Sequence, residues 1–100
     1  MVNHFPSELC NMTTVHLLIT GKVQGVFYRA TAAEQAKKRH LSGWIRNTEE
    51  GAVEATVSGS DEAVDQFIAW CRQGPKGARV ENVIITSKPD DGLVGFEVIR

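Results

Sequence analysis

The spacing of apolar residues changes along the chain in a way that separates strands from helices. Val15, Leu17 and Ile19 alternate with His16, Leu18 and Thr20, and this period of two predicts a strand beginning at Thr14. Apolar alternation or short apolar runs between turn residues predict four further strands, over residues 44–48, 52–58, 79–86 and 95–99.

Two other segments have the composition and spacing of helices. The segment from Phe27 to His40 is rich in alanine, lysine, glutamate and glutamine, which are good helix formers. The second segment opens at Ser60, a suitable N-cap, and ends at Gly74-Pro75. Each segment carries an apolar stripe at helical spacing, formed by Tyr28, Ala32 and Ala36 in the first and by Val64, Phe67, Ile68 and Cys71 in the second.

The predicted order is strand, helix, strand, strand, helix, strand, followed by a short last strand. Two βαβ-type crossovers around a hairpin predict an α+β fold, the ferredoxin-like split βαβ sandwich. Its antiparallel sheet would carry both helices on one face. Residues 1–12 are predicted to be an N-terminal extension, and residues 13–100 the single folded domain.

Charge and cysteine content exclude several classes of function. A net charge of −1 over 100 residues provides no long-range field for nucleic acid or an anionic membrane. No segment has the length of a membrane span and the first twelve residues do not resemble a secretory signal, so a cytoplasmic monomer is expected. Cys10 and Cys71 are interpreted as reduced thiols, with a disulfide between them as the alternative. Neither the cysteines nor the three histidines have metal-ligand spacing, so no metal and no cofactor is expected.

The segment from Gly21 to Arg29 has features of an anion site. Two glycines four residues apart allow positive φ angles, which can turn consecutive N–H groups toward an anion, and a helix N-terminus follows. Arg29 stands in or near the first helical turn, where a cation is disfavoured unless it serves another purpose. The alternative is that the glycines form a simple turn and Arg29 pairs with a surface carboxylate.

Two sequence motifs support the first interpretation. The nine residues Gly21-Lys22-Val23-Gln24-Gly25-Val26-Phe27-Tyr28-Arg29 resemble the phosphate-loop signature of the acylphosphatase family. A second signature of that family is similar to residues 43–47, Gly-Trp-Ile-Arg-Asn, followed by Gly51, Val53 and Gly59. The resemblance extends from Thr14 to Arg100 and omits only the N-terminal extension.

The resemblance implies roles for particular residues. Arg29 matches the phosphate-binding arginine of the family, and Asn47 matches the asparagine that orients the attacking water. The loop would bind phosphate through the backbone N–H groups of Lys22, Val23, Gln24, Gly25, Val26, Phe27 and Tyr28. The Gln24 side chain is either a further ligand or a part of the loop structure, and the alternative for Asn47 is a role in the turn that follows it.

The implied activity is hydrolysis of small acyl phosphates to carboxylate and phosphate, by direct attack of water on phosphorus. The leaving carboxylate has a conjugate acid with a pKa of roughly 4, so it needs neither a general acid nor a metal ion to depart. Neither signature contains a candidate nucleophile, so no phosphoenzyme is expected. The alternative function is a module that senses phosphate or acyl phosphate without turnover, and nothing in the sequence indicates which acyl group is recognised.

Overall fold

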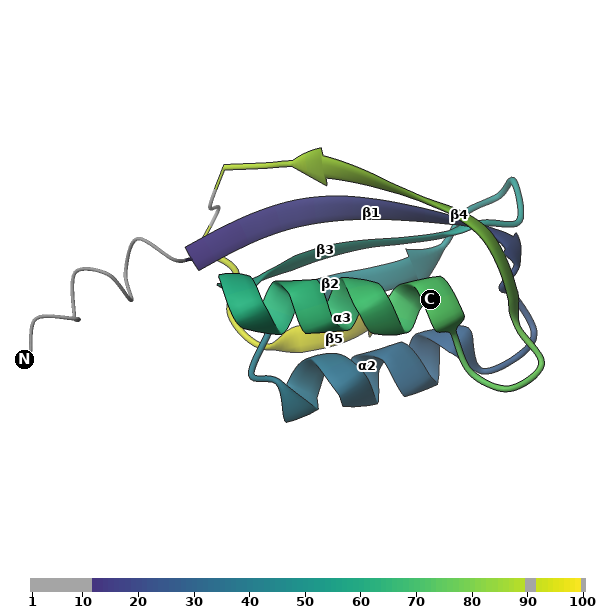
Figure 1. Ribbon diagram of the computed structural model, residues 1–100, viewed down its shortest axis with the longest axis horizontal. Coiled ribbons are helices and arrows are strands. Elements are labelled where there is room, and N and C mark those ends of the chain that lie inside the picture. The colour runs from purple at the N-terminus through teal and green to yellow at the C-terminus, as the bar shows by residue number, and fades with distance from the viewer. Residues whose placement is uncertain (1–11, 90–91, 100) are drawn as a thin grey trace, which may run out of the picture.

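Five strands and two helices make up the part of the chain that the computed structural model describes, residues 12–89 and 92–99 (Figure 1). Cys10 and all but the last residue of the predicted N-terminal extension lie outside these residues. The elements follow the predicted order: β1 (Met12–Lys22), α2 (Tyr28–Lys38), β2 (Ser42–Asn47), β3 (Val53–Ser60), α3 (Asp61–Gln73), β4 (Arg79–Ser87) and β5 (Phe96–Ile99).

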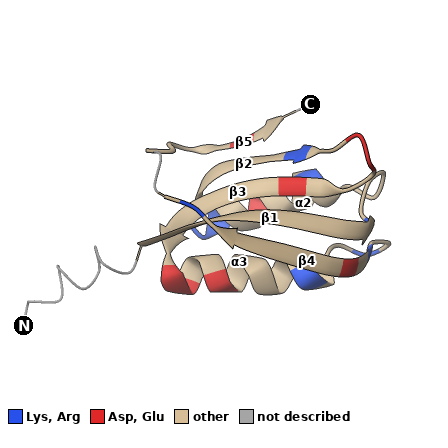
Figure 2. Cartoon of the chain, turned by 90° about the horizontal axis from the view of Figure 1, so that it is seen from above, with Lys and Arg blue, Asp and Glu red and all other residues tan. Residues whose placement is uncertain are grey.

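The sheet has the strand order β4-β1-β3-β2-β5, with both helices packed against one face of it (Figures 1 and 2). The pairs β4–β1, β1–β3 and β3–β2 are antiparallel, which confirms the predicted ferredoxin-like α+β fold. β5 differs, because it runs parallel to β2, with Gly43 opposite Phe96 and Ile45 opposite Val98. β4 runs antiparallel to β2, and the chain reverses direction between β4 and β5. β5 therefore adds one parallel pair, which makes the whole sheet mixed.

Strand alternation places the core between the sheet and the helices. Leu17, Ile19 and Ile45 are completely buried on the helix-covered face, together with Phe67 of α3. Burying a side chain of this size stabilises the fold by about 1.5–3 kcal/mol. The small side chain of Ala32 is also fully buried, which lets α2 lie close to the strands.

The ends of the helices follow from local chemistry. In α3 the Ser60 hydroxyl accepts a hydrogen bond from the Ala63 N–H at 3.2 Å, which confirms the predicted N-cap. α2 ends at Lys38, two residues before the predicted end, because His40 takes a left-handed conformation with φ of 59°. The Leu41 N–H then turns back to the Ala36 carbonyl at 2.9 Å, a typical helix C-terminus.

Two further expectations concern membranes and thiols. Neither described helix has the length and apolar character needed to cross a membrane. Cys71 carries a buried free thiol. Pairing with Cys10 falls outside the described residues.

Candidate active site

The two glycines of the predicted phosphate loop serve different purposes. Gly21 still belongs to β1, at a register shift in its pairing with β4, and a Cβ there would lie 2.1 Å from the Arg79 carbonyl oxygen. It is therefore required by close packing of two strands. Gly25 has open space around it and a φ of 77°, so it is required by the backbone path of the loop itself.

No side chain of residues 12–89 or 92–99 caps the N-terminus of α2. Phe27 stands at the N-cap with φ of 62° and ψ of 26°, and neither a capping side chain nor an acidic residue is found in the first turn. In contrast, α3 has Ser60, Asp61 and Glu62 at its start (Figure 2). Among the described residues, none of the backbone N–H groups of residues 24–30 donates to a protein acceptor. This run of donors at the positive end of a helix dipole is suited to binding an anion.

Arg29 projects from this helix start toward the last strand. Its Nη1 donates to the backbone carbonyl of Ile99 at 3.0 Å. No carboxylate of residues 12–89 or 92–99 lies within ion-pair distance of the guanidinium. Since a guanidinium has five N–H donors, one bond to a carbonyl leaves donors for a phosphate.

Asn47 is the last residue of β2, and its carboxamide makes no hydrogen bond with another described residue. The turn after it is formed by Thr48 instead. The Thr48 N–H donates to the Ala52 carbonyl at 2.9 Å, and the Ala52 N–H donates to the Thr48 hydroxyl at 3.0 Å. The structure therefore does not use the Asn47 side chain as the turn-forming group.

Arg29 and Asn47 line the same hollow of the surface. This pocket of about 420 Å³ is lined by Val23, Gly25, Phe27, Tyr28, Arg29, Ala30, Asn47 and Val98. Elements far apart in the sequence thus converge: the loop after β1, the start of α2, the end of β2, and β5. The guanidinium, the carboxamide and the uncapped helix start are brought together in one place.

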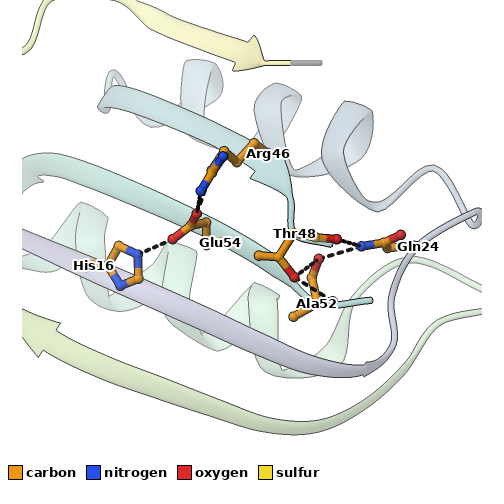
Figure 3. A network of polar contacts seen from close by, with 6 residues as sticks. All are labelled: His16, Gln24, Arg46, Thr48, Ala52 and Glu54. Carbon is orange, nitrogen blue, oxygen red and sulfur yellow. Dashed lines mark hydrogen bonds and ion pairs between the residues drawn. The ribbon is translucent and has the colours of Figure 1, made fainter. Parts of the chain in front are cut away.

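Three residues of the predicted phosphate loop do not line this pocket. Lys22 is exposed at the end of β1, where it pairs with Arg79, and Val26 packs against the core. The Gln24 side chain points to the turn between β2 and β3, where its Nε2 donates to the carbonyls of Thr48 at 2.9 Å and Ala52 at 2.7 Å (Figure 3). The sequence predicts that the Gln24 side chain is either a further ligand or a part of the loop structure, and the structure shows the second role. Gln24 fixes the loop to the turn that follows Asn47.

Tyr28 is one of the residues that line the pocket, but its side chain is almost completely buried. Its ring lies against Trp70 of α3, and its hydroxyl donates to the Cys71 carbonyl at 2.7 Å. Burial raises the pKa of Tyr28 above its ordinary value. The Tyr28 side chain therefore attaches the start of α2 to α3.

The open face of the sheet carries a polar network next to Asn47. Glu54 accepts from Nε of Arg46 at 2.5 Å, and its other oxygen lies 2.8 Å from Nε2 of His16 (Figure 3). These two contacts hold the pKa of Glu54 below its ordinary value, and the hydrogen bond with His16 contributes most. Because Arg46 immediately precedes Asn47, the network and Gln24 hold the backbone on both sides of the carboxamide.

Sequence reasoning missed the contribution of β5 to the site. Val98 lines the pocket and the Ile99 carbonyl binds Arg29. The signal available was the apolar alternation of residues 95–99, which predicts a strand but not its neighbour. Among the described residues, no group of three or more His, Cys, Asp or Glu side chains has the arrangement of a metal site.

Comparison with known proteins identifies the family of the chain. A model of the acylphosphatase family matches residues 15–98. The chain belongs to the acylphosphatase family. It is 45% identical over 85 residues to the acylphosphatase of Gloeobacter violaceus, covering 85% of this chain and 91% of that relative.

Two further relatives place the whole described fold in the acylphosphatase family. The acylphosphatase of Natronomonas pharaonis is 42% identical over 85 residues, with 85% of this chain and 92% of the relative covered. The structure of an acylphosphatase from Coxiella burnetii superposes with a TM-score of 0.87 at 30% identity, over 99% of this chain and 100% of that one.

Proposed function

We propose that this acylphosphatase hydrolyses small acyl phosphates in the pocket between the loop after β1 and the end of β2. One observation supports the proposal: Arg29 and Asn47, whose carboxamide has no hydrogen-bond partner among the described residues, line the same pocket at the uncapped start of α2. A cation, a neutral polar group and a run of free N–H donors match a phosphoryl group and the water that attacks it.

The phosphoryl group would be held by backbone and guanidinium together. Two or three of its oxygens would accept from the free N–H groups of residues 24–28, at the positive end of the helix dipole. Arg29 would add paired donors in a planar fork, which suits the oxygens of a phosphate. Its bond to Ile99 fixes the guanidinium before the substrate arrives.

The reaction would be a single displacement at phosphorus. A water held by Asn47 attacks, the new P–O bond forms from the water oxygen, and the bond from phosphorus to the acyl oxygen breaks. The carboxylate leaves with the electron pair of that bond, and the second product is dihydrogen phosphate. None of the described residues that line the pocket has a carboxylate or imidazole that could accept the water proton, so we assign that proton to a phosphoryl oxygen.

Positioning and electrostatics would account for the rate. Phosphoryl transfer has a loose transition state with charge spread over the equatorial oxygens, so oriented donors do most of the work. Because a carboxylate is a good leaving group, the proposal includes neither a metal ion nor a cofactor. We also propose that the enzyme is a cytoplasmic monomer that binds no nucleic acid. Sedimentation at micromolar concentration tests the oligomeric state.

Hydrolysis of benzoyl phosphate in EDTA tests the proposal. Arg29→Lys keeps the charge but loses the fork, and Asn47→Ala removes the group that holds the water. Each variant should reduce kcat/KM by about 100- to 1,000-fold, the usual effect of losing one oriented transition-state donor. Arg72→Lys in α3 and Asn82→Ala in β4, both exposed, are the matched controls and should retain activity.

Three results would contradict the proposal. The first is near-wild-type turnover by Arg29→Lys, and the second is binding of benzoyl phosphate without hydrolysis, as a sensing module would show. The third comes from hydrolysis in ¹⁸O-labelled water, where attack at phosphorus places the label in phosphate. Label in benzoate would instead indicate attack at the carbonyl carbon.

A further inference from the structure

The outer rim of the pocket is apolar. Of the eight lining residues, Val23 and Tyr28 are almost completely buried and form its floor. At the rim, Phe27 is 82% exposed and Val98 of β5 is 38% exposed. A phosphoryl group makes no use of such surfaces, so this rim is available to the other half of a substrate.

Phe27 is the most unusual of these residues. Its side chain packs against no part of the core, whereas those of its neighbours Val26 and Tyr28 do. Its backbone is in the left-handed region, which a bulky residue adopts unfavourably. Glycine would fit that conformation without strain, and a polar residue would suit the exposure. Folding therefore gives no reason for an aromatic ring at this position.

The in-line geometry of the proposed reaction gives a reason for the aromatic ring of Phe27. The acyl oxygen leaves from the side of phosphorus opposite the attacking water. With the water held by Asn47 at the end of β2, the acyl group extends toward the lining that β2 does not supply. At the start of α2 that lining includes Phe27, the exposed N-cap residue, and Ala30 of the first turn.

We propose that Phe27 is a specificity-determining residue whose ring receives the acyl group, so that the enzyme prefers aromatic or extended aliphatic acyl phosphates over acetyl phosphate. This inference rests on the proposed function. An aromatic acyl group gains an edge-to-face or offset contact with the ring and removes exposed apolar surface from water. An acetyl group is too small to make either contact to the same extent.

The test is the ratio of kcat/KM for benzoyl phosphate to that for acetyl phosphate. Phe27→Ala and Phe27→Gly both remove the ring, and the glycine variant also relieves the left-handed backbone. The ratio should fall about fivefold to tenfold in both, and Phe27→Leu should recover part of it. The control is Val94→Ala, because Val94 is 93% exposed and lies outside the pocket lining. The ratio for that variant should equal that of the wild type.

The outcomes separate this inference from the proposed function. A wild-type chain that hydrolyses neither substrate would overturn the proposed function and the inference with it. Hydrolysis of both by the wild type, with a ratio that stays within twofold in Phe27→Ala and Phe27→Gly, would overturn only the inference. An unchanged ratio would overturn the inference even if kcat/KM fell for both substrates, because an equal fall for both indicates a change in the phosphate loop. The inhibition constant of inorganic phosphate provides a separate measure of that loop.

Discussion

The guanidinium of Arg29 donates to the backbone carbonyl of Ile99 across 70 positions of sequence. This hydrogen bond joins the start of α2 to the last described residue of β5. A free arginine side chain has several rotamers, and the bond selects one that faces the pocket. Thus β5 adds more than a fifth strand to the sheet, because it holds the one cationic side chain among the pocket-lining residues.

Removal of residues 99 and 100 tests this relationship. When the new C-terminus at Val98 is amidated, so that no carboxylate replaces the lost carbonyl, Arg29 loses its acceptor, and kcat/KM for benzoyl phosphate should fall about tenfold, as expected for a hydrogen bond to a charged group. Ile99→Ala is the control, since it removes an exposed side chain and keeps the carbonyl. Equal activity of the truncated chain and the control would show that β5 does not position Arg29.

The double hydrogen bond from Gln24 predicts a variant that weakens both stability and turnover. Gln24→Ala leaves the loop unattached to the turn after Asn47, and should lower the free energy of unfolding by about 1–3 kcal/mol and reduce kcat. Gln24→Glu should be worse, because it places a carboxylate against the carbonyls of Thr48 and Ala52. Urea unfolding and benzoyl phosphate hydrolysis measure the two effects.

The control is Gln66→Ala, on the exposed side of α3, which should change neither stability nor turnover. A Gln24→Ala variant as stable and active as wild type would show that Gln24 does not attach the loop to the turn after Asn47.

The lowered pKa of Glu54 predicts a pH-dependent part of stability. A carboxylate whose pKa is lower in the folded than in the unfolded chain stabilises the fold at pH values above its ordinary pKa of about 4.3. This stabilisation is lost as the pH falls through the pKa that the group has in the folded chain. Glu54→Gln should therefore lose about 1 kcal/mol at pH 7, and the difference from wild type should shrink toward pH 3. Urea unfolding from pH 7 to pH 3 measures this. Glu34→Gln on the exposed surface of α2 should parallel wild type, and a constant difference for Glu54→Gln would contradict the argument.

The buried thiol of Cys71 should be inert in the folded protein. Burial raises its pKa to about 12, so almost no thiolate is present near neutral pH, and the sulfur is shielded from reagents. In a Cys10→Ser variant, a disulfide-exchange reagent at pH 8 should label no thiol in buffer and one thiol in guanidinium chloride. Rapid labelling in buffer would show that the core opens near α3.

Much of the fold could be predicted because its signals are local. The alternation of Val15, Leu17 and Ile19, the Ser60 cap and the helical stripes each depend on neighbouring residues, and the structure confirms them. The parallel pairing of β5 with β2 is not local. It depends on where a short strand finds an unpaired edge, and nothing in residues 95–99 specifies that edge.

The candidate site divides in the same way. The placing of Arg29 and Asn47 in one candidate site could be anticipated from two family signatures, and the structure has both residues in the lining of one pocket. The role of the Ile99 carbonyl could not be anticipated, because every type of residue carries the same backbone acceptor. Gly21 also shows the limit of motif reasoning, since its sequence spacing indicates a loop while its contacts reveal a strand crossing close to Arg79.

The strand order has a consequence for how quickly activity can appear in a refolding chain. Of the described strands, only β2 and β3 form a hairpin, whereas Val15 of β1 lies opposite both Val57 and Ser87. Pairings over such sequence separations are reached slowly, so a domain of this topology is expected to acquire its structure over milliseconds to seconds. The phosphate loop continues directly from β1 and gains fixed ends only when those distant pairings exist. Recovery of catalysis should therefore coincide with the slow global step, with no earlier partially active species.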